Sequence, residues 1–206
     1  MRIISGIKRG MVILPPKGSD TRPITDRVKE SIFDVLYKYN LIEDRVVADL
    51  FCGTGSFGLE SLSRGAKEAV FVDMGRDAIE ILRKNITKAG FLSQARVACT
   101  NAFRVGAPPA AGGEKYSLVF VDPPYEMSRG TGGKSRLAGL LELLQEQIAD
   151  DGLVVVRTEK KVNLLDSYGS LKIIDKRIWS TMAVAFLALR KDDRQTSGNT
   201  DNSEPA

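Results

Sequence analysis

A carboxylate, two prolines and an aromatic ring follow one another at Asp122-Pro123-Pro124-Tyr125. Residues 116–121 before them are apolar and β-prone, which predicts a buried strand with this tetrapeptide at its carboxyl end. Two prolines end a central strand, because each lacks an N–H and has a fixed φ. In open α/β sheets this edge binds ligands. We expect Asp122 and the Pro123 carbonyl to accept hydrogen bonds from an amino group, and Tyr125 to stack on the base that carries it.

A glycine-rich loop is the second candidate site. Gly53, Gly55 and Gly58 form a G-x-G-x-x-G pattern after a predicted buried strand at 45–51 and before a predicted helix. In that context the glycines allow a tight turn and a close approach of the backbone to a ligand. The loop therefore predicts binding of a cofactor that contains a nucleoside.

Two acids narrow the choice of cofactor. Asp73 lies 18 positions after Gly55, at the end of the next predicted strand, where a carboxylate can accept hydrogen bonds from ribose hydroxyls. Asp49 precedes the glycine loop and favours S-adenosylmethionine over a dinucleotide. A carboxylate there would attract the amino group of a methionyl moiety, whereas it would repel a pyrophosphate.

The residues that are missing limit the chemistry. The sequence has no histidine and only two cysteines, with no CxxC pair, which excludes a Ser-His-Asp hydrolase and argues against a metal site. Amino nitrogens of guanine, adenine or glutamine are weak nucleophiles because their lone pair is delocalised. Acceptors placed at both N–H groups favour the tetrahedral, nucleophilic form, and alignment with a sulfonium methyl group would supply most of the remaining rate.

Alternating strands and helices predict the scaffold that positions these sites. Residues 44–190 read as one α/β doubly wound sheet that ends in a strand pair, preceded at 1–43 by a β-hairpin and a helix capped by Thr25. Residues 191–206 show no periodicity and are expected to be a disordered tail.

Positive charge gathers at the front of the chain, which has a net charge of +4 and a pI near 9.1. A basic leading segment can be a phosphate-binding face, although a solvated surface explains charge alone somewhat better. No run is long and apolar enough to span a membrane and no signal peptide is evident, so we expect a cytoplasmic location. A monomer is a separate expectation that the sequence does not itself establish. The candidate RNA-binding residues are Arg2, Lys8, Arg9, Arg22, Thr25, Arg27 and Lys29.

Three segments together resemble the bacterial RsmD family of 16S rRNA guanine-N2 methyltransferases. Residues 1–6 and 22–33 are similar to the family's leading signature, residues 49–66 to its cofactor loop, and the Asp-Pro-Pro-Tyr motif to its catalytic tetrapeptide. The chain differs from the family pattern in having Met74-Gly75 after Asp73 and Asn101 before Ala102.

The resemblance implies a class I S-adenosylmethionine-dependent (Rossmann-like) fold with strand order 3-2-1-4-5-7-6 and an antiparallel last strand. It implies methylation of one guanine N2 in 16S rRNA, within an assembling small ribosomal subunit. It also adds Phe51, Asn101 and Ala102 to the cofactor site.

Alternatives remain open at this point. The tetrapeptide also permits methylation of DNA adenine N6 or of protein glutamine N5, although glutamine enzymes usually carry Asn where this chain has Asp122. The glycine loop alone would permit an NAD(P) oxidoreductase. A non-catalytic RNA-binding assembly factor could use the same fold.

Overall fold

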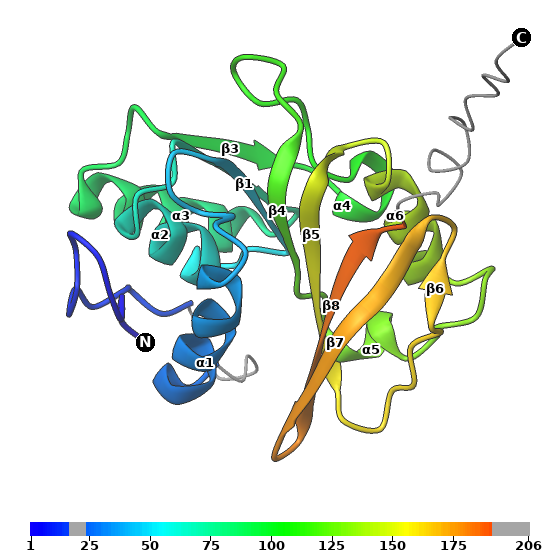
Figure 1. Cartoon of the computed structure of the whole chain (residues 1–206). Coiled ribbons are helices and arrows are strands. Elements are labelled where there is room, and N and C mark those ends of the chain that lie inside the picture. The colour runs from blue at the N-terminus through cyan, green and yellow to red at the C-terminus, as the bar shows by residue number, and fades with distance from the viewer. Residues whose placement is uncertain (17–23, 191–206) are drawn as a thin grey trace, which may run out of the picture.

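The computed structural model describes residues 1–16 and 24–190, and it is built on an eight-stranded sheet in the order β3-β2-β1-β4-β5-β8-β7-β6 (Figure 1). Strands β1 to β5 are mutually parallel, whereas β8 is antiparallel to both β5 and β7. The strands are β1 Val46–Leu50, β2 Glu68–Asp73, β3 Ala95–Cys99, β4 Tyr116–Val121, β5 Ile148–Glu159, β6 Ser167–Tyr168, β7 Leu171–Trp179 and β8 Met182–Leu189. The helices are α1 Asp26–Tyr37, α2 Ser56–Ser63, α3 Arg76–Ala89, α4 Ala102–Val105, α5 Tyr125–Ser128 and α6 Arg136–Leu144.

This order confirms the predicted doubly wound sheet. β8 and β7 are the predicted seventh and sixth strands, and the two-residue β6 adds an edge strand that the sequence pattern does not indicate. The expected disordered tail, residues 191–206, lies outside the described residues. No helix of the described residues is long and apolar enough to cross a membrane.

Alternation along the strands divides the core into two layers. Helices α1, α2 and α3 cover one face of the sheet, and α4 and α6 cover the other (Figure 1). On β4, for example, Leu118 and Phe120 pack under the first group of helices, whereas Val119 and Val121 pack under the second. This is the period of two that a strand buried on both faces imposes. A residue's position on a strand therefore fixes the helix layer that its side chain faces.

The front segment, residues 1–14, is called the arm below. The expected hairpin of two strands, 1–5 and 9–14, is reduced to a single bridge between Arg2 and Val12. Backbone bonds between Ile3 and Met11 and between Ile13 and Met1 hold its two limbs together. Ile3 and Ile13 are buried in the same core layer as α1, α2 and α3, so the arm packs on the sheet domain.

A buried polar network fastens the arm to α2. The carboxylate of Glu60 accepts hydrogen bonds from the backbone N–H groups of Ile4 (2.7 Å) and Ser5 (3.0 Å). It also pairs with Lys29 of α1 (3.0 Å) and Arg64 (2.8 Å). Two oxygens thus receive four donors, which satisfies a carboxylate that is completely buried.

A second link joins the arm to the glycine loop. The side chain of Asn85, buried on α3, accepts from the N–H of Leu14 (2.9 Å) and donates to the carbonyl oxygens of Leu14 (3.2 Å) and Thr54 (3.0 Å). Thr54 lies between the first two glycines of the loop. One amide group therefore holds the arm and the loop at a fixed separation.

Candidate active site

The tetrapeptide lies where β1, β4 and β5 end side by side. Leu50 is paired with Val121 and Val121 with Val156, in parallel register. Asp122 directly follows the last residue of β4, and Arg157 directly follows Val156 on β5, so their side chains lie at the same level of the sheet edge. The Arg157 Nε atom donates to Asp122 Oδ1 at 2.6 Å, and the two side chains are only 13% and 17% exposed.

The same alternation gathers three carboxylates on one face. Asp49, Asp73 and Asp122 each follow a residue of the opposite core layer, so all three side chains face the α1–α3 side. They are close enough that Asp73 and Asp122 both raise the pKa of Asp49 by repulsion. The structure thus brings these three candidate residues together at one sheet edge.

The three glycines have different tasks. Gly53 has a φ of +52°, and an added Cβ would meet no atom within 4 Å, so its backbone faces open space. At Gly55, with a φ of +91°, a Cβ would lie 2.5 Å from Leu82 of α3, and at Gly58 it would lie 2.2 Å from the Phe71 ring. Only the first glycine therefore opens the backbone to a ligand, while the other two let α2 pack closely.

Asp73 organises the turn around the loop. Its carboxylate accepts from the N–H of Gly53 (2.8 Å) and from the N–H of Gly75 (2.8 Å). The side chain is half-buried, so further donors can still reach its oxygens. The ribose contact predicted for Asp73 stays a prediction.

Asp49 is 1% exposed and accepts a hydrogen bond from the Gly58 N–H at 2.8 Å. Burial raises the pKa of its carboxyl group to about 7, with Asp122 and Asp73 adding repulsion. No cation of the described residues pairs with it. A buried carboxylate poised near neutrality next to an open loop is suited to a ligand that brings its own positive charge.

The tetrapeptide itself turns more sharply than an extended segment would. Pro123 is buried, Pro124 is exposed, and the one-turn helix α5 begins at Tyr125, whose ring is half-buried. Burial raises the pKa of Asp122, while the guanidinium of Arg157 opposes that rise. Among the described residues, Arg157 makes the only hydrogen bond to the Asp122 side chain. One carboxylate oxygen is thereby left for a ligand.

An aromatic residue, Phe51, lies at the start of the glycine loop, directly after β1. Phe51 has a positive φ of 59° and packs against Phe103, with ring centroids 4.8 Å apart. Asn101 caps α4 by accepting from the Phe103 N–H (3.0 Å), and Ala102 is buried beneath. These residues form an apolar wall at the ends of β1 and β3, and their contact with an adenine stays a prediction.

The candidate RNA-binding residues differ in exposure and in the partners that they bind. Arg9, Thr25 and Arg27 are exposed, and Lys8 is partly exposed. Arg2 is exposed and pairs with Asp26 (2.7 Å). Thr25 also caps α1 as predicted, although its bond to the Val28 N–H is long at 3.4 Å. Arg22 lies outside the described residues.

The prediction for Lys29 is wrong in this structure, because its side chain is completely buried. The ammonium group donates to the Arg2 carbonyl oxygen (2.7 Å) and pairs with Glu60 (3.0 Å), where no phosphate can reach it. Burial lowers the pKa of Lys29, and Glu60 opposes that shift.

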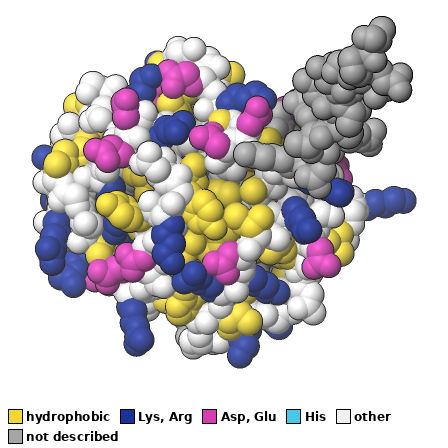
Figure 2. Space-filling model, viewed as in Figure 1, with side chains coloured by type: hydrophobic (Ala, Val, Ile, Leu, Met, Phe, Trp, Pro, Cys, Tyr) yellow, Lys and Arg dark blue, Asp and Glu magenta, His cyan; other side chains and the backbone are white. Residues whose placement is uncertain are grey.

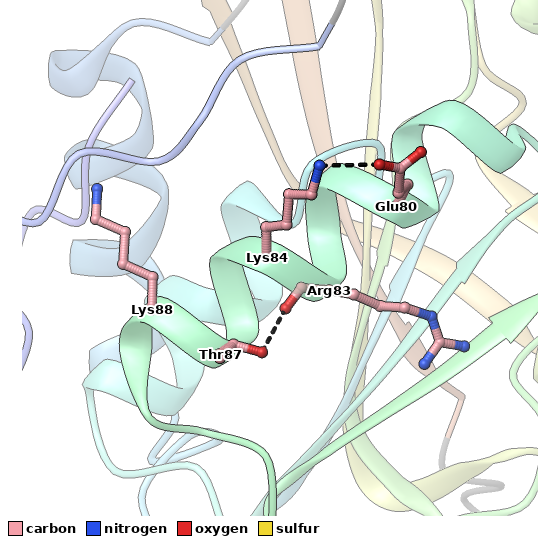
Figure 3. Close-up of a pocket in the computed structure, with 5 residues that line it drawn as sticks. All are labelled: Glu80, Arg83, Lys84, Thr87 and Lys88. Atoms are coloured by element: carbon pink, nitrogen blue, oxygen red, sulfur yellow. Dashed lines mark hydrogen bonds and ion pairs between the residues drawn. The ribbon is translucent and has the colours of Figure 1, made fainter.

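A shallow hollow on the outer face of α3 lies apart from this edge. Its five lining residues all come from α3, and Lys84 donates a hydrogen bond to Glu80 of the same helix (Figure 3). It has no part in the site just described. Within residues 1–16 and 24–190, no group of acidic or cysteine side chains is arranged to hold a metal ion.

The sheet order, the glycine loop and the acids at the ends of β1, β2 and β4 define a class I methyltransferase. An S-adenosylmethionine-dependent methyltransferase from Clostridium acetobutylicum shares this fold, with a TM-score of 0.61 at 13% identity over 79% of this chain and 91% of that one. A family model described as "Conserved hypothetical protein 95" matches residues 1–188, and the chain belongs to this family, the RsmD family of the sequence resemblance.

Individual relatives agree with this assignment. The chain is 33% identical to "Putative rRNA methyltransferase YlbH" of Bacillus subtilis over 92% of its length and all of the relative. It is 36% identical to "Ribosomal RNA small subunit methyltransferase D" of Escherichia coli, over 77% of this chain and 75% of the relative. The solved structure titled "Putative methyltransferase yhhF from Escherichia coli" has a TM-score of 0.75 at 30% identity, covering 92% of this chain and 98% of that one.

Proposed function

We propose that the chain transfers a methyl group from S-adenosylmethionine to the exocyclic N2 of a guanine in small-subunit (16S) rRNA. The observation that carries the proposal is the Asp122 carboxylate, with one oxygen held by Arg157, at the sheet edge shared with the glycine loop. The names of the Bacillus and Escherichia relatives support rRNA as the substrate. The choice of guanine N2 rests on the family resemblance.

The cofactor residues fit the methyl donor, which would supply an activated sulfonium methyl group. Gly53 gives backbone access, Asp73 offers acceptors for hydroxyl groups, and Asp49 offers a buried negative charge for an ammonium group. Phe51 and Phe103 offer an apolar wall for a planar ring.

The tetrapeptide prepares the nucleophile. The open oxygen of Asp122 and the Pro123 carbonyl accept the two N–H bonds of the amino group, which directs the nitrogen lone pair towards the methyl carbon. Tyr125 stacks on the base and holds it out of its helix. The nitrogen–carbon bond forms as the sulfur–carbon bond breaks, the bonding pair stays on sulfur, and one amino proton leaves to Asp122 or water. We assign Asp122 mainly an orienting role, since burial raises its pKa and the ion pair with Arg157 opposes that rise.

The RNA contact is proposed for the arm and the start of α1. Figure 2 shows the side of the molecule that carries these segments, with Lys and Arg side chains interspersed with Asp and Glu around hydrophobic side chains near the middle of the view. Such a distribution favours binding to a shaped RNA surface, as in an assembling ribosomal subunit, over a single electrostatic groove. The monomeric state and the cytoplasmic location stay predictions.

The test compares Asp122→Asn and Asp122→Ala with Asp150→Asn, an exposed acid at the opposite end of β5. Small ribosomal subunits from a strain that lacks the gene are incubated with labelled cofactor and digested to nucleosides for mass spectrometry. We expect N2-methylguanosine with the wild type and Asp150→Asn, and a loss on the order of 100-fold or more with both Asp122 variants. If the label appeared on adenosine or on protein, guanine would not be the substrate. Undiminished transfer by Asp122→Ala would exclude the proposed role of Asp122.

A further inference from the structure

Arg157 is the charged neighbour that the Asp-Pro-Pro-Tyr motif does not include. It follows Val156, the last residue of β5 that pairs with β4, and it lies directly beside Asp122. Its Nε–Oδ1 contact of 2.6 Å is short for a nitrogen donor. Tyr125 also lies near enough to raise the pKa of Arg157. The guanidinium is therefore bonded to Asp122 and lies within electrostatic range of Tyr125, the two side chains that the motif devotes to the substrate.

Two features show that this pair is poorly suited to a purely structural role. Both side chains are largely buried, and a buried ion pair gives little net stability because its desolvation cost is high. In addition, Arg157 Nη1 is buried and has no hydrogen-bond partner among the described residues. An N–H group left in that state costs stability, and such groups in folded proteins call for a functional explanation.

We propose that Arg157 is a positioning residue of the active site, which holds Asp122 Oδ1 so that only Oδ2 is presented to the substrate amino group. A carboxylate with two open oxygens could rotate and accept from water or from a wrongly placed base. With Oδ1 fixed, Oδ2 can accept a hydrogen bond from only one direction. A fixed acceptor direction is needed to align a weakly nucleophilic nitrogen with the methyl carbon. The inference rests on the proposed methyltransferase activity.

Charge gives the same residue a second effect on Asp122. Burial raises the pKa of Asp122, and Arg157 is the group that lowers it again. The other titratable groups nearby are Asp49 on β1 and Tyr125 on α5, and neither brings a positive charge. Removing Arg157 should therefore raise the pKa of Asp122 further, and the acceptor would be protonated at a higher pH.

The experiment compares Arg157→Met, which removes charge and donor, with Arg157→Lys, which keeps the charge. Arg177→Met is the matched control, since Arg177 also bonds through Nε to an aspartate, Asp175 (3.0 Å), but on β7. For each, methyl transfer is measured across pH with saturating cofactor. The carboxyl titration of Asp122 is followed by carbon NMR, with Asp122→Asn identifying the signal.

We expect Arg157→Met to lower kcat at neutral pH by roughly 10- to 100-fold, with the KM for the cofactor unchanged. The acid limb of its pH–rate profile and the titration of the Asp122 carboxyl group should both move to higher pH by on the order of one unit. Arg157→Lys should restore the titration and part of kcat, and Arg177→Met should resemble the wild type.

Two results would overturn the inference. One is an Arg157→Met enzyme with wild-type kcat and acid limb. The other is an equal loss in the Met and Lys variants with no movement of the Asp122 titration, which would mark Arg157 as structural. Absence of methyl transfer by the wild type would instead refute the proposed function, and the NMR titration would still decide whether Arg157 controls Asp122.

Discussion

Two buried charged clusters lie on the same side of the sheet, and they differ in how completely their groups are satisfied. In the first, which we call the arm joint, Glu60 binds Lys29, Arg64 and two arm N–H groups. In the second, which we call the carboxyl edge, the described residues give Asp49 no cationic partner and leave a buried N–H of Arg157 without an acceptor.

This difference in pairing distinguishes a cluster that stabilises the fold from one that is suited to bind a ligand. A network in which every donor meets an acceptor holds elements together, as the arm joint does for α1, α2 and the arm. Incomplete pairing at the carboxyl edge costs stability, and that cost is expected where a ligand completes the set. The predictions that follow test this contrast, beginning with the largest effect.

Replacing Glu60 with Gln should lower the free energy of unfolding by about 3–5 kcal/mol, because Lys29 and Arg64 would keep buried positive charge without its counter-ion. Chemical denaturation at neutral pH measures the change. Glu80→Gln, in an exposed pair with Lys84, is the control and should stay within about 0.5 kcal/mol. Equal stability of the two variants would contradict a structural role for the arm joint.

A methyl group at Gly6 should disturb the arm joint by sterics alone. Gly6 has a φ of +80°, and an added Cβ would lie 1.7 Å from the Ser63 carbonyl oxygen. Gly10 has a φ of +85° but open space around the same position. We expect Gly6→Ala to cost about 2–4 kcal/mol and Gly10→Ala about 1–2 kcal/mol in thermal or chemical unfolding. Similar costs at both positions would mean that the arm is not held tightly against α2.

At the carboxyl edge, Asp49→Asn should stabilise the protein without cofactor and lower its affinity for the cofactor. The raised pKa of Asp49, about 7, means that the folded state holds a proton that the unfolded state releases near pH 4. The free protein therefore loses stability as the pH rises towards 7, and the Asn variant should escape that loss at pH 8. Denaturation curves of the wild type and of Asp49→Asn without cofactor, at pH 5 and pH 8, test the predicted direction of the change in the free energy of unfolding.

The same group should make cofactor affinity depend on pH. Only ionised Asp49 attracts an ammonium group, so the Kd of S-adenosylhomocysteine should rise up to about tenfold per unit as the pH falls below 7 and change little above it. Calorimetry on the wild type and on Asp49→Asn gives the comparison. A wild-type Kd that is flat from pH 6 to pH 8 would exclude this role.

The smallest effect is expected at the exposed pair of Arg2 and Asp26. Its side chains are 60% and 40% exposed, so Arg2→Ala should change the free energy of unfolding by less than about 1 kcal/mol. If Arg2 contacts an RNA phosphate, the variant should reduce the salt slope of RNA binding by about one. An unchanged slope would remove Arg2 from the proposed RNA contact.

Much of the carboxyl edge could be predicted because it depends on local rules. The motif and the glycine loop each follow a buried strand, and strand ends in a parallel sheet meet at one edge, so Asp49, Asp73 and Asp122 could be placed together. Arg157 could have been found by the same rule, since it lies two residues after Val155 on the strand next to the motif.

The arm joint could not be predicted in this way. The apolar stripe of α1 gives no sign that Lys29 is buried, because its partner Glu60 comes from another element 31 positions later. A charged side chain near a helix start is normally solvated, and only the tertiary contact reverses that expectation. The reduced hairpin has the same cause, since the arm bonds to α2 and α3 instead of completing its own strands.

The links to Glu60, Ser63 and Asn85 also constrain the order of events during synthesis. The arm's partners follow it by 55 to 71 positions in the chain. Its residues therefore leave the ribosome well before α2 and α3 exist, and they must stay unattached until both helices have formed. The segment made earliest is thus among the last to be fixed in place, and the arm can close over the sheet only when the glycine loop is already built.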